Sequence, residues 1–225
     1  MDRKQQTAGL VLAVFILFAA APGCGKEACH VTERSHSFSD IAHYAERMDT
    51  PGRDKWQKPD KVIAMMRLKK GDYVADVGAG TGYFARRIAL AVAPGGSVTG
   101  YDTEKNMVAY MRDDARKRGI DNYRSELVTV KDQVYPAGKF DVIFICNVYH
   151  HVDEGLPFLQ GLGKALKKSG RIIMVDHKMD APYGPPKKLR VAKHQAIADF
   201  KTAGFFLVKD EDILPEQYYL EFRAK

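Results

Sequence analysis

The glycine-rich turn at residues 78–82 constrains this chain of 225 residues more than any other segment. It reads Gly-Ala-Gly-Thr-Gly, follows the strand-like segment 72–77 directly and precedes a helical pattern over residues 83–92. Glycines at such a turn permit positive φ angles and let the backbone approach a ligand closely. A strand, a glycine turn and a helix in this order predict a site for a nucleotide-like cofactor.

Hydrophobic periodicity alternates between strand-like and helical segments along the chain. Residues 139–146 form a nearly continuous apolar run, as buried parallel strands do. Strands alternating with helices of about 10–15 residues predict an α/β fold with a doubly wound, Rossmann-like sheet. The predicted strands are 72–77, 97–101, 126–130, 139–146, 171–176, 205–209 and 217–222. The predicted helices are 38–48, 59–68, 83–92, 104–118, 155–167 and 186–203.

An acidic residue at the end of the second strand indicates what kind of cofactor is bound. Asp102 lies twenty residues after Gly82, where a carboxylate can accept hydrogen bonds from both hydroxyls of a ribose. A dinucleotide fingerprint would place its third glycine at position 83, which is Tyr83. The spacing therefore disfavours NAD and a nicotinamide-dependent oxidoreductase.

Residues 74–85 resemble the first motif of class I S-adenosylmethionine (SAM)-dependent methyltransferases, and the resemblance extends over most of residues 50–222. Residues 51–59, 147–151 and 214–222 resemble a bacterial subgroup of this family that is known as methyltransferases by sequence alone. The resemblance implies a seven-stranded, mostly parallel sheet with an antiparallel last strand. It also implies SAM as the cofactor, with helices before the sheet that cover the SAM site.

The resemblance assigns the cofactor-binding residues to strand ends and the turns that follow them. Asp76 would steady the glycine turn or meet the amino group of SAM, Asp102 would hold the ribose, and Asn147 would lie beside the methyl group. Asp132 would meet the adenine amine, although a solvated loop residue is an equal interpretation there. The full expected set is Asp76, Gly78, Gly80, Thr81, Gly82, Asp102, Thr103, Asp132 and Asn147.

Catalysis of methyl transfer needs positioning and exclusion of water more than covalent chemistry, because the sulfonium is already activated. A hydroxyl or ammonium acceptor also needs a base, and the family places substrate-side groups where this chain has Tyr149, His150 and His151. Histidine suits that task near neutral pH. Adjacent side chains of an extended segment point to opposite sides, so we expect at most one histidine to face the site. A packing or capping role is the alternative for each.

Composition narrows the class of acceptor. The chain has 35 Lys+Arg against 28 Asp+Glu, a formal charge of +7, but the basic residues of its clusters at 164–171 and 187–193 recur at helical spacing, as on ordinary solvated faces. Enzymes that methylate planar exocyclic amines often carry two prolines directly after the Asn or Asp, whereas Asn147 is followed by Val148 and Tyr149. We therefore expect a small-molecule or lipidic acceptor and no nucleic acid. Three cysteines without paired Cys/His spacing predict no metal site.

The amino terminus has the architecture of an export signal. Basic residues precede an uncharged apolar stretch at residues 8–21, which is too short to span a bilayer. Gly23-Cys24 resembles a bacterial lipoprotein cleavage site. We predict a signal peptide at 1–23, a linker at 24–37 and the methyltransferase domain at 38–225, with a lipid anchor at Cys24 that holds the protein on the periplasmic side of a membrane. The alternative is an uncleaved signal-anchor with a cytosol-facing domain.

These observations leave two hypotheses about function. The leading one is a SAM-dependent methyltransferase for an unidentified, small acceptor. The other is an exported lipoprotein that retains the fold as a non-catalytic binding module, because SAM is made in the cytosol and an export signal would carry the domain away from it.

Overall fold

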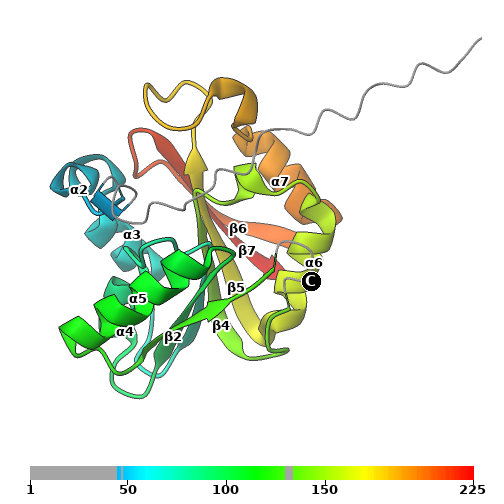
Figure 1. The fold of residues 1–225 in the computed structure, drawn as a ribbon. Helices are drawn as coiled ribbons and strands as arrows, with labels where there is room; N and C mark the ends of the chain where they lie inside the picture. The colour runs from blue at the N-terminus through cyan, green and yellow to red at the C-terminus, as the bar shows by residue number, and fades with distance from the viewer. Residues whose placement is uncertain (1–44, 47, 130–133) are drawn as a thin grey trace, which may run out of the picture. The chain divides into compact units, whose positions relative to one another are not determined.

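The computed structural model describes residues 45, 46, 48–129 and 134–225. Its centre is a seven-stranded sheet with the strand order β3-β2-β1-β4-β5-β7-β6 (Figure 1). The strands are β1 (Tyr73–Val77), β2 (Ser97–Asp102), β3 (Tyr123–Leu127), β4 (Phe140–Cys146), β5 (Leu166–His177), β6 (Phe205–Glu211) and β7 (Gln217–Ala224). The helices are α2 (Pro51–Gln57), α3 (Pro59–Met66), α4 (Ala85–Val92), α5 (Lys105–Arg118), α6 (Gly155–Ala165) and α7 (Lys193–Thr202), with 3-10 turns η1 (Tyr149–His151) and η2 (Lys187–Leu189).

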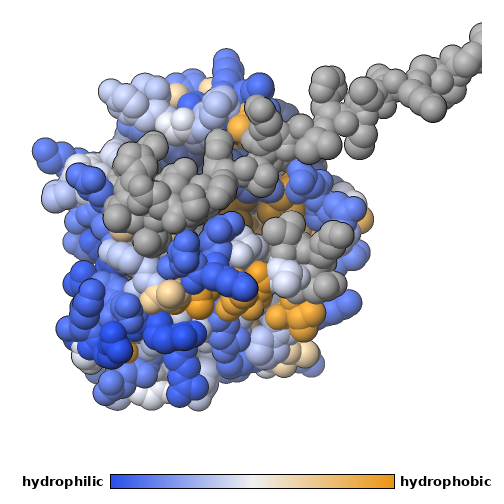
Figure 2. Space-filling model, in the orientation of Figure 1, coloured by the Kyte–Doolittle hydropathy of each residue, from blue (hydrophilic) through white to orange (hydrophobic). Residues whose placement is uncertain are grey.

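Apolar side chains cover both faces of the sheet because successive strand residues point to opposite sides. On β4, Ile143 and Ile145 belong to one core, which α6 and α7 complete, whereas Val142 and Phe144 belong to the other, which α3, α4 and α5 complete. Helices therefore pack on both faces of the sheet, as Figure 1 shows. On the face drawn in Figure 2 the surface is largely hydrophilic, with apolar patches near its centre.

The strand order places the site between β1 and β4. The chain proceeds from β1 to β2 and β3 on one side, then crosses to β4 and β5 on the other, so β1 and β4 are neighbours with parallel direction. In open α/β sheets, ligands bind beyond the carboxyl ends of strands at such a switch point. The glycine turn follows β1 and Asn147 follows β4, which brings the two segments together.

The predicted seven strands and the direction of the last one are confirmed. β7 runs antiparallel to both of its neighbours, β5 and β6, while every other pair in the sheet is parallel. Antiparallel pairing is possible here because β6 and β7 are joined by a short connection rather than by a crossover helix.

Two predicted boundaries in the sheet are wrong. The third strand occupies Tyr123–Leu127 rather than residues 126–130, because this strand at the sheet edge buries Tyr123 and exposes polar residues that carry little hydrophobic signal. The helix predicted at residues 155–167, α6, ends at Ala165, and the strand predicted from residue 171 begins at Leu166. Leu166 pairs with Phe140, and a bulge then shifts the register. The residues just after position 167, where the predicted helix was expected to stop, therefore lie within β5.

The helices also differ from the prediction in two places. No helix was predicted between residues 48 and 59, whereas Pro51 begins α2 there, since proline lacks only a backbone donor that the first helical turn leaves unused. The helix predicted from residue 186 begins at Lys193, after the 3-10 turn η2. Most of the helix predicted at 38–48, and all of the predicted signal peptide and linker, lie outside the described residues.

None of the helices in the described part of the chain combines the length and apolar composition needed to cross a membrane. Within the same residues, no three His, Cys, Asp or Glu side chains are grouped as a metal site requires.

Gly82 is required at its position for a steric reason. Its φ is +76°, and a Cβ added there would lie 1.7 Å from the hydroxyl oxygen of Tyr123 and 3.2 Å from the side chain of Met111. Tyr123 comes from β3 and Met111 from α5, so the glycine turn, the sheet edge and the helix meet without space for a methyl group.

We predict that Gly82→Ala lowers the free energy of unfolding by about 3–5 kcal/mol, the sum of left-handed strain and overpacking. Gly119→Ala is the matched control, because Gly119 also has a positive φ (+64°) but no atom of the residues that the structure describes lies within 4 Å of an added Cβ. It should cost only about 1–2 kcal/mol. Denaturant unfolding of both variants measures the difference. Equal losses would show that strain alone, not the contact with Tyr123, requires glycine.

Candidate functional site

The glycine turn is held by the neighbouring strand. The N–H groups of Gly78 and Ala79 both donate to the carbonyl of Tyr101 on β2, at 2.8 and 3.0 Å. Gly78, Gly80 and Gly82 all have positive φ angles, between 57° and 76°. The left-handed conformation at three positions explains why the turn is rich in glycine.

Asp102 fastens the same turn through its side chain. One carboxylate oxygen accepts the Gly80 N–H at 2.8 Å, and the other accepts the Glu104 N–H at 3.0 Å. Burial raises the pKa of Asp102, while these backbone hydrogen bonds oppose the rise. Thr103, the expected neighbour of the ribose, is exposed beside it. Asp102 thus already supports the turn, and its remaining lone pairs are what a ribose could use.

A cavity of about 520 Å³ opens at the carboxyl ends of β1, β4 and β5. This is within the size range of small-ligand sites. The glycine turn forms one end, and the histidines after β4 and β5 form the other. Its lining comprises Met48, Arg53, Trp56, Asp76, Gly78, Ala79, Gly80, Thr81, Tyr83, Phe84, Cys146, Asn147, His150, His151, His177, Gly184, Pro185, Pro186 and Leu189.

Asp76 and Arg53 both line the cavity, and the charge of Arg53 acts on the Asp76 carboxyl. Asp76 is 3% exposed, and its Oδ2 has no hydrogen-bond partner among the described residues. Burial raises the pKa of Asp76 to about 7, and the charge of Arg53 is the main opposing effect. The Arg53 guanidinium stacks on the Tyr83 ring at 3.8 Å and donates to the carbonyl of Met48 at 2.7 Å.

These features fit the methionine end of SAM. A buried carboxylate with an unused oxygen suits an ammonium group, and a guanidinium suits a carboxylate. Among the described residues, a Cβ added at Gly80 would meet only Met48, at 3.4 Å, so these residues leave space above the turn. The sequence did not predict Arg53 as a site residue, because it lies 25 residues before the glycine turn.

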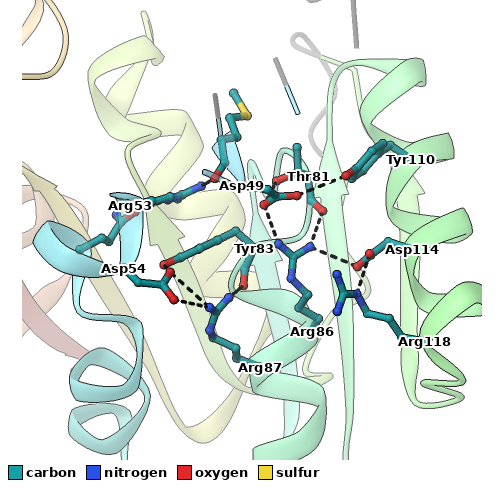
Figure 3. Close-up of polar contacts among 12 residues, drawn as sticks. Asp49, Arg53, Asp54, Thr81, Tyr83, Arg86, Arg87, Tyr110, Asp114 and Arg118 are labelled. Carbon is teal, nitrogen blue, oxygen red and sulfur yellow. Dashed lines mark hydrogen bonds and ion pairs between the residues drawn. The ribbon is translucent and has the colours of Figure 1, made fainter. Parts of the chain in front are cut away.

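Asp49 connects the segment before α2 to the helices that follow the glycine turn (Figure 3). Its carboxylate accepts hydrogen bonds from the hydroxyls of Thr81 and Tyr110 and from the guanidinium of Arg86. Arg86 also pairs with Asp114 of α5 at 3.1 Å. The hydroxyl of Thr81, an expected cofactor-binding residue, therefore holds the segment over the turn.

A second acidic residue, Asp54, ties α2 to α4 (Figure 3). It accepts a hydrogen bond from the Tyr83 hydroxyl and pairs with Arg87 at 3.3 Å. Arg87 in turn donates to the Tyr83 carbonyl at 2.8 Å. Together with the Asp49 contacts, these bonds hold residues 48–57 against the cavity, in agreement with the expected cover over the SAM site.

A chain of amide hydrogen bonds positions Asn147. The Gln57 side chain donates to the Cys146 sulfur at 3.1 Å and to the Gln217 side chain at 3.0 Å, and Gln217 donates to Asn147 Oδ1. Asn147 itself has a positive φ of 60°. These bonds join the end of β4 and the start of β7 to α2 at the cavity.

Both histidines after β4 line the cavity, so the expectation that at most one would face the site is wrong. The segment is a 3-10 turn rather than an extended strand, and successive side chains in such a turn do not alternate. His150 is buried and His151 is exposed, with ring centroids 4.1 Å apart. Nδ1 of His150 lies 2.8 Å from Asp176 Oδ1.

Four of the expected residues that the structure describes do not line the cavity: Gly82, Asp102, Thr103 and Tyr149. Tyr149 packs against Phe158 and Phe200, and its hydroxyl donates to Asp199 at 3.0 Å on the α7 side. Asp132 lies outside the described residues.

The loop after β5 forms a wall of the cavity that the sequence did not predict. Arg190 donates to five carbonyls, those of Lys178, Met179, Ala181, Tyr183 and Pro185. This folds residues 178–190 so that Gly184, Pro185, Pro186 and Leu189 reach the cavity. The two prolines were the available signal, since they favour a rigid turn over the helix that was predicted there.

Acidic partners meet several residues of the basic clusters. Lys167 pairs with Asp141 at 2.7 Å, Arg171 with Glu221 at 3.4 Å and Lys193 with Asp210 at 2.9 Å. The pairs of Lys167 and Lys193 are partly exposed, whereas the pair of Arg171 and Glu221 is largely buried, with 12% and 1% of these side chains exposed.

The profile of a family described as "Methyltransferase domain" matches residues 68–215. The chain is 27% identical over 122 residues to a demethylmenaquinone methyltransferase of Listeria welshimeri, covering 54% of this chain and 51% of the relative. It is 32% identical over 118 residues to a "Probable cobalt-precorrin-6B C(15)-methyltransferase (decarboxylating)" of Saccharolobus solfataricus, covering 50% of this chain and 56% of the relative. The chain thus spans about half the length of these curated relatives.

Among solved structures, a SAM-dependent methyltransferase from Aquifex aeolicus superposes with a TM-score of 0.76 at 24% sequence identity, covering 81% of this chain and 97% of the other. At that identity the likeness concerns the fold, which is the α/β methyltransferase fold expected from the glycine turn. Because the family profile covers well over half of the sequence, the chain belongs to the methyltransferase domain family.

Proposed function

We propose that this protein transfers the methyl group of SAM to a small-molecule acceptor. The observation that carries the proposal is one cavity lined by the glycine turn, by two adjacent histidines and by Asp76, whose Oδ2 has no hydrogen-bond partner in the described part of the chain. Family membership supports methyl transfer as the reaction, and SAM supplies the activated methyl group.

The cavity suggests a role for each cofactor-binding residue. Asp76 would bind the SAM ammonium and Arg53 its carboxylate, while Gly80 leaves room for the methionine chain and Gly78, which packs against Val148, would shape the turn beneath it. Asp102 would use its remaining lone pairs for the ribose, and Asn147 would lie near the methyl group. Thr103 and Asp132 remain predictions for the ribose and the adenine.

The acceptor side supports a small molecule. Trp56, Pro185, Pro186 and Leu189 form largely apolar walls around the histidines, as in pockets for small organic ligands. The named relatives act on demethylmenaquinone and on a cobalt-precorrin, which are small molecules. Positioning beside the methyl group and exclusion of water would supply much of the rate, with His150 or His151 as a base.

Gly80→Val should weaken SAM binding by roughly a hundredfold or more, because the valine side chain would occupy the space above the turn where SAM would lie against the protein backbone. The fold should survive, since Met48 is the only described residue that lies near the added Cβ. Gly119→Val, at a similar φ but far from the turn, is the control for strain. Isothermal titration with SAM measures both. Unchanged affinity in folded Gly80→Val would remove the glycine turn from the cofactor site.

SAM affinity should rise with pH and level off near pH 7. Asp76, with a pKa of about 7, is largely neutral below that pH, and an ammonium ligand favours its ionised form, so binding releases a proton. Above about pH 8 affinity should fall again as the SAM amino group loses its proton. Asp76→Asn should abolish the rise between about pH 5.5 and 7. Titrations in buffers of different ionisation enthalpy count the protons released; an undiminished rise in the variant would contradict the assignment.

The N-terminal segment bears on the cellular compartment in which the domain would act. We infer that the precursor is exported and lipidated at Cys24, which leaves the domain tethered to a membrane on the periplasmic side. Arg3 and Lys4, the apolar stretch at 8–21 and Gly23-Cys24 support this inference. A signal-anchored, cytosol-facing enzyme with access to SAM is the alternative. A non-catalytic binding module would bind SAM at the same site but show no turnover.

Wild type and Cys24→Ser distinguish these possibilities when the full chain is expressed in a bacterial host. Lipidation predicts that wild type loses residues 1–23, gains the mass of several acyl chains and partitions into detergent, because a single acyl chain holds a protein only marginally. Cys24→Ser should lack the added mass. If wild type begins at Met1 and both proteins partition identically, the uncleaved anchor is correct.

A further inference from the structure

The acceptor end of the cavity contains a histidine–carboxylate pair that the sequence did not reveal. Nδ1 of His150 lies 2.8 Å from Oδ1 of Asp176, and these side chains are 4% and 1% exposed. The two residues come from different elements, since His150 follows β4 and Asp176 lies near the end of β5. The pairing of β4 with β5 brings them together.

This hydrogen bond fixes the tautomer of the imidazole. An ionised carboxylate can only accept, so the proton of a neutral His150 lies on Nδ1 and the lone pair on Nε2. Asp176 is itself held, because the same oxygen accepts the His177 N–H at 2.8 Å. A carboxylate that orients a histidine in this way also stabilises the imidazolium that forms when Nε2 takes up a proton.

The surroundings of His150 contain other ionisable groups from each neighbouring element. Its direct neighbours are Asp176 and His177 of β5 and His151 of the same 3-10 turn, and beyond them Cys146 of β4 lies near Asp176 and Arg190 of the following loop lies near His177. Burial lowers the pKa of His177 to about 4, and burial strongly raises the pKa of Cys146. Both are therefore neutral near pH 7, which leaves the Asp176 carboxylate in direct contact with His150.

The walls indicate which acceptor this pair would serve. Trp56 lies with its ring centroid 6.0 Å from that of His177, and the Arg190-organised loop contributes Pro185, Pro186 and Leu189. Such walls provide little solvation for a cationic ammonium group. They suit the faces of a flat, uncharged ring, whose hydroxyl would then be the group that meets a base.

We propose that Asp176 positions His150 as the base that deprotonates a neutral aromatic hydroxyl acceptor, giving O-methylation. This inference rests on the proposed function. The hydroxyl proton passes to His150 Nε2, and the acceptor oxygen forms its new bond to the methyl carbon as the carbon–sulfur bonding pair returns to sulfur. The products are a methyl ether, S-adenosylhomocysteine and a His150 imidazolium paired with Asp176, so atoms and charge balance. His150 is a catalytic residue here, and Asp176 is a positioning residue.

A pair of acceptors with the same ring separates the base from its surroundings. At about pH 7.5, 1-naphthol is un-ionised and needs a base, whereas 4-nitro-1-naphthol is mostly ionised and needs none. His150→Gln should lower kcat/KM for 1-naphthol roughly 100-fold to 10,000-fold, but less than about tenfold for the nitro analogue. Asp176→Asn should show the same selective loss, roughly 10-fold to 100-fold, with SAM affinity unchanged. His194→Gln, at an exposed position on α7, is the matched control.

A second measurement needs no turnover. Long-range proton–nitrogen NMR of labelled protein should show His150 protonated at Nδ1 in wild type and a mixture of tautomers in Asp176→Asn. An Nε2-protonated His150 in wild type, or equal losses for both naphthols, would overturn the proposal. So would the absence of methyl transfer to either naphthol by wild-type protein that binds SAM. Failure of wild type to bind SAM would instead count against the proposed function.

Discussion

The hydrogen bond from the Gly80 N–H to the Asp102 carboxylate determines the shape of the turn on which the cavity rests. Together with the two bonds to the Tyr101 carbonyl, it ties the end of β1 to the end of β2 and aims the turn at the space above the sheet. Gly82 allows that turn to lie directly against β3 and α5. Any ligand of this domain must fit around a backbone that is already fixed.

Charged groups then hold the cover of the cavity. Burying ions is costly unless they are paired and hydrogen-bonded, and Arg86 meets this requirement with Asp49 on one side and Asp114 on the other. Removing one partner would leave a buried charge unpaired, which is the expensive outcome. The network therefore gives residues 48–57 one position over the glycine turn, and with it places Arg53 beside Asp76.

The two ends of the cavity use burial in different ways. At the glycine turn, desolvation raises the pKa of Asp76 into the neutral range, so an arriving cation can ionise it. At the acceptor end, desolvation keeps His177 uncharged while Asp176 directs its neighbour His150. One cavity wall thus combines a buried carboxyl, whose Oδ2 has no partner among the described residues, with a histidine held by a second carboxyl, the combination that the proposed methyl transfer to a neutral hydroxyl would use.

The local pattern of the sequence was sufficient for the sheet, the glycine turn and Asp102, because positive φ angles, helix periods and buried strand runs depend on near neighbours in the chain. It was insufficient at the edge strand β3, whose polar residues carry no clear period, and at the histidines, where a 3-10 turn replaced extended chain. Only the tertiary structure placed Arg53, Trp56, Asp176 and His177 around one cavity. These residues are separated by up to 124 positions, and the adjacency of β1, β4 and β5, which no local pattern encodes, brings them together.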